Sequence, residues 1–525
     1  MIPRFCFLVL LTCGTVWPSP PMRIPLKVTG SFGEYRDEHL HAGLDLSTYA
    51  STGHEVLAIE EGWLYRVKQK PSGEGRTIYL RHRNSRISVY AHLEDFSSRI
   101  QAILPNTRIF DMFPDSRIPF KEGEVIGYSG ESGRGLPHLH LEVRSSMTRA
   151  KSHSMYIDGV KDQVAPTISS ILLVPFMRDT QRVRLRVDKK PHKIKVSHPV
   201  GVAVEAFDLF DESDAPCHIP EFRLYRSRKL IYHVKMAELS HLRDYASAMH
   251  YLRDSTNLGP TVFTYKLYRD YVQKSPFILT PSTTAALGAG SHQLRLEAED
   301  FHGNISSFEF ELEVERGEVP NLEAYSGSHF LRKGNFSLHF PKGKLSSAAS
   351  PRIEPINPAS LRVPGAVEGF ILSPSYLFWT ERAKVEYTGE TGGKEYFLFW
   401  NAVESRFEPT RREKKSNLLS ARISQPGKYL VARDFKPPRI EKEIQTLKAK
   451  RKTFYYISAT DTGSGIDPGS VHSSCGQNSL EGEWDIDRKW VRWQRIPCPK
   501  ITLALCDYVG NCTQEELNVK GAKRR

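Results

Sequence analysis

Two short histidine groups in the N-terminal part of the chain have side chains that can bind a catalytic metal. His41 and Asp45 are four residues apart, and His138 and His140 follow much later in the sequence. Zinc binds imidazole nitrogen and carboxylate oxygen, and a catalytic zinc keeps three protein ligands with water in the fourth position. His41, Asp45 and one histidine of the second pair would supply such a set. We therefore predict a zinc site.

The second histidine pair begins a predicted strand, because residues 139–143 alternate apolar and polar side chains. Residues two apart in a strand point to the same face, so His138 and His140 can face one groove. One of them can then bind the metal while the other meets a substrate. Each motif alone is short and common, so the prediction depends on their combination.

Further short motifs surround these residues, among them Tyr90-Ala-His92-Leu93 between the two groups. The others are Gly30–Arg36, Gly53–Ala58, Glu61–Leu64, Gly123–Gly127, Ser129–Gly133 and Leu136–Arg144. Their order closely resembles the lysostaphin-type, or LytM-type, zinc metallopeptidases of the duplicated hybrid motif fold. The resemblance covers roughly residues 26–150.

The resemblance implies a role for five residues. His41, Asp45 and His140 would bind Zn²⁺, and His92 and His138 would flank the attacked carbonyl. Zinc lowers the pKa of its bound water to about 7, a histidine can take the proton of that water, and an imidazole can stabilise the oxyanion. Non-catalytic members of the family have lost ligands. This chain keeps them all, which favours an active enzyme over a degenerate binding module.

The chain departs from the family pattern in two places. The segment 94–121 is longer than the usual connection and contains three prolines, so we consider it a lid or a wall of the groove. His39, His54 and His82 are additional histidines. His39 could compete for the metal if the chain around it is extended, although solvent exposure is the simpler expectation.

Length and composition indicate a multidomain globular protein with basic character. The chain has 525 residues, enough for about three or four domains, with 39% hydrophobic and 25% charged residues. Its net charge of +13 favours polyanionic partners such as anionic envelope polymers, although charge spread for solubility explains it equally well. We found no nucleic-acid motif, so nucleic acid is not an expected partner.

The N-terminus predicts export. Arg4 precedes an apolar run from Phe5 to Trp17, which is typical of a signal peptide over residues 1–19 and too short for a transmembrane helix. Lipidation at Cys13 is an alternative, because residues 10–13 loosely resemble a lipobox. The mature protein is expected to be periplasmic, outer-membrane-associated or secreted.

Cysteine usage agrees with an oxidising compartment. Cys475, Cys498, Cys506 and Cys512 cluster near the C-terminus, and four cysteines allow three connectivities. Cys506 and Cys512 flank a turn sequence and could face each other across a hairpin. A zinc site is the rival interpretation, but the close spacing it usually needs is missing. Cys217 is expected to be a buried thiol.

The predicted fold class is mainly β: a LytM-type β-sheet peptidase domain (26–150) followed by β-sandwich, immunoglobulin-like domains. Strands are expected at 56–59, 63–67, 77–80 and 87–91, and later at 168–175, 182–187, 200–207, 291–299 and 308–314. The later domains are predicted at 165–317, 318–435 and 440–520, the last one containing the clustered cysteines. Spacing at Met236, Leu239 and Leu242 predicts a short helix within 235–252.

The sequence Asp-x-x-Gly-Asn occurs twice, at 300–304 and 507–511, each time after an alternating strand. This predicts two copies of one sandwich type. Acidic turns can bind calcium, but a single Asp within each turn is too few for a cage.

Three functions remain open at this point. The first is a zinc endopeptidase that cleaves peptidoglycan cross-links or stem peptides. The second is a binding or regulatory envelope protein that keeps its metal but does not cleave, and the third is a secreted peptidase that acts on proteins.

Overall fold

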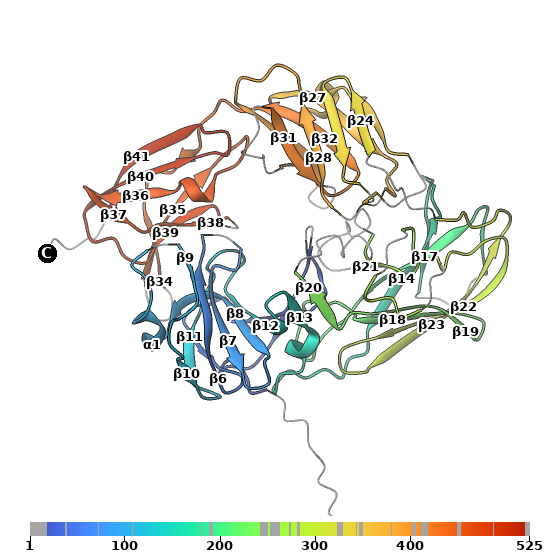
Figure 1. Cartoon of the computed structure of the whole chain (residues 1–525), viewed down its shortest axis with the longest axis horizontal. Helices are drawn as coiled ribbons and strands as arrows, with labels where there is room; N and C mark the ends of the chain where they lie inside the picture. Colours follow the sequence, from blue (N-terminus) through green and yellow to red (C-terminus); the bar gives the residue numbers. More distant parts are fainter. Residues whose placement is uncertain are drawn as a thin grey trace, which may run out of the picture.

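The computed structural model shows an almost entirely β protein whose sheets form four consecutive units, as the mainly-β prediction requires (Figure 1). It describes residues 18–519 except 37–38, 72, 108, 179, 188–192, 242–249, 253–262, 272–274, 281–283, 323–328, 343, 346–349, 378, 380, 402–405, 411–417, 449–452 and 487. The predicted signal peptide and Cys13 therefore lie outside the described residues, apart from residues 18–19. Among the described residues, no helix is long and apolar enough to cross a membrane.

The N-terminal unit (residues 18–160) is organised around one twelve-stranded sheet. Its main path runs β1 (Val28–Gly30), β4 (Leu44–Ser47), β12 (His138–Ser146), β8 (Ile87–Phe96), β7 (Arg76–His82), β6 (Gly62–Gln69) and β10 (Pro119–Phe120). Beside this path lie β5 (Glu55–Leu57), β9 (Phe110–Met112), β11 (Val125–Ser129), β13 (Arg149–Lys151) and β20 (Glu238–Ser240), and β2 (Tyr35–Arg36) pairs with β3 (His39–Leu40). The four strands predicted between residues 56 and 91 are confirmed as β5 to β8.

The centre of this sheet brings the predicted site residues together. Strand β12 pairs antiparallel with β4 on one side and with β8 on the other. His140 lies opposite Asp45 of β4 and opposite Ala91 of β8, one residue before His92. The three motifs that carry Asp45, His92 and His140 are far apart in the sequence, but they lie side by side because their strands are adjacent in the sheet.

The long segment after β8 extends the sheet at its far edge. It contains the short helix α1 (Ser98–Gln101) and the strands β9 and β10, and both strands pair with β6. Because β7 separates β6 from β8, these two strands lie beside the edge of the sheet and do not pair with the strands that carry the histidines.

The first sandwich (residues 167–314) has two sheets. One contains β15 (Val183–Arg186), β14 (Thr167–Pro175), β17 (Val200–Phe207) and β21 (Phe263–Lys266), and the other contains β16 (Lys193–Val196), β23 (Ile305–Val314), β22 (Gly290–Glu299), β18 (Glu221–Arg226) and β19 (Lys229–Lys235). The five strands predicted here are confirmed. The 3-10 helix η1 (Ser152–Met155) precedes this unit.

The helix predicted within 235–252 is wrong at residues 238–240, which form strand β20 and pair with β13. Met236 and Leu239 are both buried, so their three-residue spacing reflects two separate contacts and not one helical face. The remaining residues of that prediction lie mostly outside the described residues.

Two further sandwiches complete the chain. The second sandwich (329–433) has two sheets. One contains β24 (His329–Lys333), β25 (Phe336–Phe340), β28 (Ala383–Tyr387) and β31 (Leu419–Ile423). The other contains β26 (Arg352–Ile356), β27 (Ala366–Ser373), β32 (Gly427–Arg433), β29 (Glu395–Asn401) and β30 (Arg406–Pro409), and the 3-10 helix η2 (Pro358–Leu361) belongs to the same unit. The third sandwich (439–519) also has two sheets. One contains β33 (Arg439–Ile440), β35 (Thr453–Thr460), β39 (Trp490–Trp493), β38 (Glu483–Asp485) and β34 (Gln445–Lys448). The other contains β37 (Asn478–Leu480), β36 (His472–Cys475), β40 (Lys500–Cys506) and β41 (Cys512–Asn518), and the 3-10 helix η3 (Pro468–Ser470) belongs to the same unit.

The third sandwich contains two disulfides, Cys475–Cys498 and Cys506–Cys512. The predicted pairing across the hairpin is therefore confirmed, and these four cysteines do not form a zinc site. Cys217 is a buried free thiol, also as predicted.

The sheets form four units, but the main hydrophobic cores do not correspond to these units one to one. The N-terminal unit and the first sandwich share one continuous core, whereas the second and third sandwiches each have a core of their own. Burial of apolar surface is the main stabilising contribution in folding, so the first two units are expected to unfold together.

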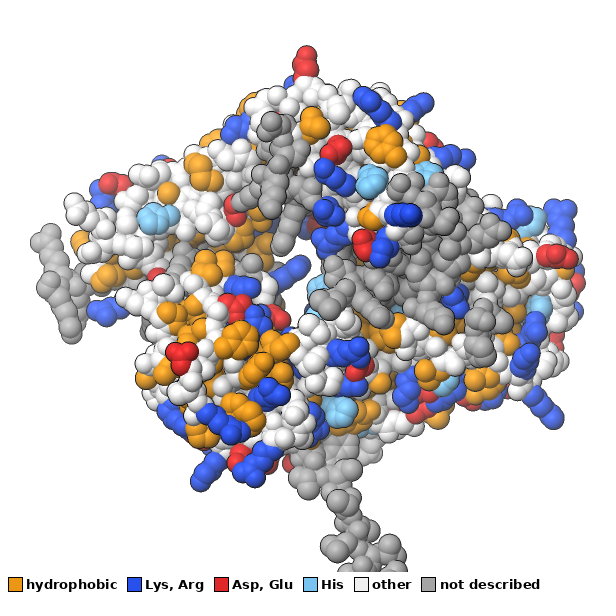
Figure 2. All heavy atoms as spheres, viewed as in Figure 1, with side chains coloured by type: hydrophobic (Ala, Val, Ile, Leu, Met, Phe, Trp, Pro, Cys, Tyr) orange, Lys and Arg blue, Asp and Glu red, His pale blue; other side chains and the backbone are white. Residues whose placement is uncertain are grey.

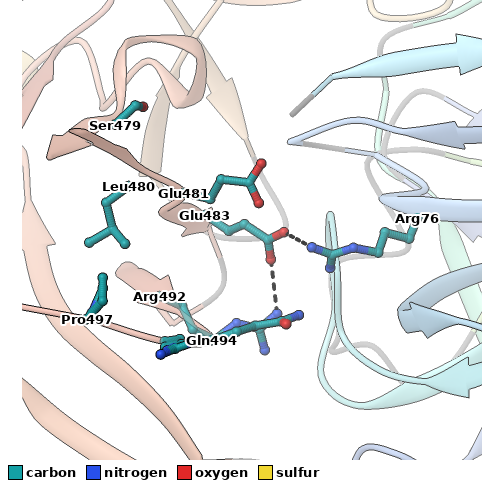
Figure 3. Close-up of a pocket in the computed structure, with 9 residues that line it drawn as sticks. Arg76, Ser479, Leu480, Glu481, Glu483, Arg492, Gln494 and Pro497 are labelled. Atoms are coloured by element: carbon teal, nitrogen blue, oxygen red, sulfur yellow. Dashed lines mark hydrogen bonds and ion pairs between the residues drawn. The ribbon is translucent and has the colours of Figure 1, made fainter. Parts of the chain in front are cut away.

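The units follow one another around a ring, so the third sandwich meets the N-terminal unit (Figure 1). Figure 3 shows this contact, where Glu483 lies between Arg76 of the N-terminal unit and Arg492 of its own sandwich. Lys and Arg side chains are spread widely over the face shown in Figure 2 and do not gather in one patch. That distribution agrees with the interpretation that the positive charge is spread over the surface and serves solubility.

Candidate metal centre and active site

Three buried donor atoms converge at the middle of the N-terminal sheet. His41 Nε2 lies 3.0 Å from Asp45 Oδ1 and 2.9 Å from His140 Nδ1, and His140 Nδ1 lies 2.8 Å from Asp45 Oδ1. All three residues are buried. Two imidazole nitrogens and one carboxylate oxygen at such mutual distances fit the three protein ligands of a catalytic zinc.

A glycine makes this convergence possible. A Cβ atom on Gly43, between His41 and Asp45, would lie 2.5 Å from the Leu141 carbonyl oxygen and 2.9 Å from Cε1 of His140. Both contacts are too close, so any other residue would push β4 away from β12. The glycine in the His-Ala-Gly-Leu-Asp motif therefore lets the two ligand-bearing strands approach.

Each candidate ligand is oriented by a second partner. His41 Nδ1 donates to the Ser31 carbonyl oxygen at 2.7 Å, and His140 Nε2 lies 3.1 Å from Glu142 Oε1. The second Asp45 oxygen accepts a hydrogen bond from Arg36 at 2.8 Å. Such outer contacts fix the ring orientation and tautomer of metal-binding histidines.

Two carboxylates, Asp45 and Glu142, lie against His140. Burial would lower the pKa of His140, but hydrogen bonds to Asp45 and Glu142 raise it to about 10. By contrast, burial lowers the pKa of His41 to about 4, despite the nearby Asp45. Asp45 and Glu142 thus favour positive charge at the His140 position. A bound metal ion would supply that charge in place of a proton, because ligands must be deprotonated to bind.

Two further imidazoles lie beside the three donors. The His92 ring centroid is 4.5 Å from that of His138 and 5.9 Å from that of His140. His92 Nδ1 donates to the Ser132 carbonyl oxygen at 2.9 Å, and His138 Nδ1 donates to that of Leu136 at 2.6 Å. In the tautomer that carries its hydrogen on Nδ1, the Nε2 atom of either ring keeps a lone pair that can accept a proton.

The structure thus brings all five predicted residues into one place. The additional histidines do not join them: His39 is exposed on β3, His54 lies 2.7 Å from the Ser51 hydroxyl, and His82 is buried against Ser88.

Comparisons with known proteins agree with this part of the chain only. No protein-family model matches. The chain is 33% identical over 106 residues to the DD-carboxypeptidase/endopeptidase Mpg of Neisseria meningitidis serogroup B and to that of Neisseria gonorrhoeae. The match covers 20% of this chain and 20% of each relative, so the chain spans about a fifth of the length of these relatives.

Two solved structures match the same fraction of the chain. One is the catalytic domain of the prophage-encoded M23 protein EnpA from Enterococcus faecalis, at 21% identity and a TM-score of 0.18, covering 24% of this chain and 85% of that one. The other is a zinc-containing peptidase from Vibrio cholerae, at 21% identity and a TM-score of 0.19, covering 24% and 36%. Each of these two matches covers about a quarter of this chain.

The surroundings of the site include residues for which the sequence analysis predicted no role. Glu142 is buried and also accepts hydrogen bonds from Arg144, at 2.6 and 3.0 Å, so it links His140 to a fixed positive charge. Its place two residues after His140 on the same strand face was a usable signal. Arg36, which holds Asp45, was part of a quoted motif.

The first sandwich also reaches the site. His241 Nε2 lies 3.3 Å from Glu142 Oε2, and the His218 backbone N–H donates to the Ser31 hydroxyl at 2.7 Å. Ser31 and Glu142 are the outer partners of the two histidine ligands. The first sandwich therefore supports the metal site directly, which agrees with the core that it shares with the N-terminal unit.

Proposed function

We propose that this protein is a zinc-dependent endopeptidase of the bacterial envelope that cleaves peptide cross-links or stem peptides of peptidoglycan. The observation that carries the proposal is the triangle of His41, Asp45 and His140, with donor atoms 2.8–3.0 Å apart and two imidazoles alongside. Similarity to a DD-carboxypeptidase/endopeptidase supports peptide-bond hydrolysis.

His41, Asp45 and His140 would hold the zinc, which when bound supplies Lewis acidity and a water of lowered pKa. His92 and His138 present their Nε2 atoms beside the donors. One of them would accept the proton of the attacking water at Nε2, and the other, once protonated at Nε2, would donate a hydrogen bond to the carbonyl oxygen as negative charge develops there. Their Nδ1 contacts to backbone carbonyls hold both rings in place before substrate binds.

Peptidoglycan is proposed as substrate because the LytM-type resemblance and the predicted export place the enzyme at the cell wall. The basic net charge of +13 suits an envelope with anionic polymers. The immunoglobulin-like character of the sandwiches belongs to the same proposal, and so do the proposed limits of the domains. These units would position the N-terminal unit on its substrate.

The test is digestion of purified sacculi by the zinc-loaded full-length mature chain, with muropeptides separated by chromatography. Wild type should release peptides, and His140→Ala should release none and lose its zinc. Glu309→Gln, at an exposed position of β23, is the control and should behave as wild type. A zinc-loaded wild type that releases nothing would overturn the proposal.

A binding or regulatory protein that keeps its metal without cleaving is the second candidate. Arg488 and Arg492 of the third sandwich form ion pairs with Glu131, and the next residue, Ser132, accepts the hydrogen bond from His92. This contact favours the second candidate, because the third sandwich could restrict access to the site. Sacculus binding without product supports this candidate. Zymography with a protein substrate separates both from a secreted peptidase that acts on proteins.

A further inference from the structure

Three buried carboxylates meet where the N-terminal unit joins the first sandwich. Asp162 lies in the connecting segment, Asp208 directly follows β17, and Asp300 begins the turn between β22 and β23. One oxygen from each lies within 4.8 Å of the others. The turn itself has a single Asp, as the sequence shows, and the fold adds two carboxylates from outside the turn.

One of these carboxylates is fully buried with poorly satisfied oxygens. Asp208 is 0% exposed, and neither of its carboxylate oxygens has a partner within normal hydrogen-bond geometry among the described residues, although the Leu209 backbone N–H and the Asp162 carboxyl lie near it. The Oδ2 atom of Asp162 is also buried without a hydrogen-bond partner among the described residues, and His302 Nδ1 lies 3.6 Å from it. An unpaired buried carboxylate is costly, so such a group normally signals a bound partner.

The pKa values of these carboxyls also indicate repulsion between buried negative charges. Burial, together with the neighbouring Asp162 and Asp300, raises the pKa of Asp208 to about 8. Burial also raises the pKa of Asp300. Like charges in one buried site repel, and a divalent cation would convert that repulsion into attraction.

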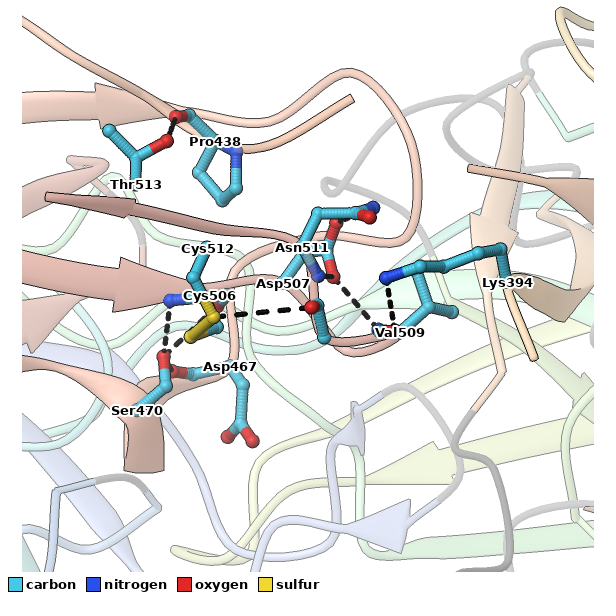
Figure 4. Close-up of a disulfide and its surroundings, with 11 residues drawn as sticks. Lys394, Pro438, Asp467, Ser470, Cys506, Asp507, Val509, Asn511, Cys512 and Thr513 are labelled. Carbon is cyan, nitrogen blue, oxygen red and sulfur yellow. Dashed lines mark hydrogen bonds between the residues drawn. A yellow bond between two sulfur atoms is a disulfide. The ribbon is translucent and has the colours of Figure 1, made fainter. Parts of the chain in front are cut away.

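The third sandwich repeats this arrangement. Asp434 lies in the segment that leads into it, Asp461 directly follows β35, and Asp507 begins the turn between β40 and β41, with one oxygen from each again within 4.8 Å of the others. Asp461 Oδ1 is buried without a hydrogen-bond partner among the described residues. Figure 4 shows Asp507 and Asn511 in the turn closed by the Cys506–Cys512 disulfide.

The correspondence extends to individual hydrogen bonds. Asn304 donates from Nδ2 to the Asp162 carbonyl oxygen at 3.2 Å and to Asp300 at 2.7 Å. Asn511 donates in the same way to the Asp434 carbonyl oxygen at 3.0 Å and to Asp507 at 2.6 Å. Each asparagine therefore ties the turn to the connecting segment in the same way.

We propose that Asp162, Asp208 and Asp300 bind a calcium ion, and that Asp434, Asp461 and Asp507 bind a second one. Calcium suits sites built from carboxylate oxygens, and water or backbone carbonyls would complete the six to eight oxygens that it takes. Each ion would fix a sandwich to the segment that precedes it. These sites are separate from the candidate zinc site, and their existence does not depend on peptidase activity.

Equilibrium dialysis with radioactive calcium tests the proposal on the zinc-loaded full-length chain, in calcium-free buffer that contains zinc. Wild type should bind two calcium ions per chain. Asp208→Asn and Asp461→Asn should each lose one ion, and the double variant should lose both. Glu309→Gln is the charge-matched control and should keep two. Binding of magnesium or manganese in place of calcium, or unchanged calcium binding in both variants, would overturn the assignment.

Thermal unfolding distinguishes a ligand from a merely structural aspartate. Without calcium, Asp208→Asn should melt at the same temperature as wild type or higher, because it removes a buried carboxyl whose ionised form is disfavoured by burial and by Asp162 and Asp300. With calcium, wild type should melt higher than the variant. A variant that is less stable than wild type in both conditions by the same margin would mean that Asp208 only supports the fold, and the proposal would fail.

Discussion

Glu131 of the N-terminal unit forms an ion pair with Arg492 of the third sandwich, 361 residues later in the chain. Arg488 pairs with the other oxygen of Glu131. The side chains of Glu131 and Arg492 are 2% and 6% exposed, so this is a buried contact. The next residue, Ser132, accepts the hydrogen bond from His92. The last unit of the chain is therefore connected to the candidate catalytic histidine through two adjacent residues.

Breaking this ion pair should open the ring. Glu131→Gln leaves Arg488 and Arg492 without their carboxylate, and breaking a buried pair costs about 3–5 kcal/mol. We expect a larger radius of gyration in small-angle X-ray scattering and faster proteolysis between the second and third sandwiches. The exposed Glu481→Gln, in the same sandwich, is the control. An unchanged radius of gyration would show that the other contacts suffice.

Acid should weaken the same contact through Glu483. Burial alone would raise the pKa of this carboxyl, but Arg76 and Arg492 lower it from 4.5 to about 2. The folded pKa is below the unfolded one, so the stabilisation is present above about pH 4.5 and is lost as pH falls toward 2. Its size at neutral pH is about 3 kcal/mol.

Scattering measured between pH 5 and pH 2.5 checks this expectation. Wild type should expand over that range before the whole chain unfolds, as judged by circular dichroism. Glu483→Gln should already be expanded at pH 5 and should change less. An identical pH dependence in both proteins would assign the expansion to other carboxyls.

Much of the local structure could be predicted because it follows from short patterns of neighbouring residues in the sequence. Strands such as β7 and β22 follow from alternating side chains, and the Cys506–Cys512 pair follows from a six-residue hairpin. The five site residues could be named together because a family resemblance joined motifs that no spacing rule connects. The β12 pairing with β4 and β8 then explains why they meet.

Long-range relationships could not be predicted from such patterns. Nothing near Glu131 in the sequence indicates a partner at Arg492, and Asp208 belongs to no motif until the fold places it beside Asp300. The error at 238–240 has a similar origin, because Leu239 is buried against a strand from another unit and not along a helix. Burial patterns reveal that a residue is inside, but they do not identify its neighbours.

Glu142 should control zinc affinity although it does not contact the metal. Glu142 Oε1 lies within hydrogen-bond distance of His140 Nε2, and the Glu142 carboxylate also contacts Arg144 and His241 Nε2. Loss of such an outer partner typically costs 10–100-fold in metal affinity, so we expect this loss in Glu142→Gln. Competition with a zinc chelator measures it. Glu238→Gln on β20, which pairs with the surface residues Arg149 and Lys151, should leave zinc affinity unchanged.

His92 should be required for turnover and dispensable for zinc. Its backbone has φ of 59°, a conformation that asparagine tolerates better than most residues, so His92→Asn removes the imidazole with little strain. A positioned acid or base contributes about 10²–10⁴-fold, and kcat on a defined cross-linked peptide should fall by that factor. Zinc content should stay at one ion per chain, because His92 is outside the donor triangle. Loss of zinc together with activity would instead make His92 part of the metal site, and full activity in His92→Asn would leave His138 as the imidazole that moves the proton.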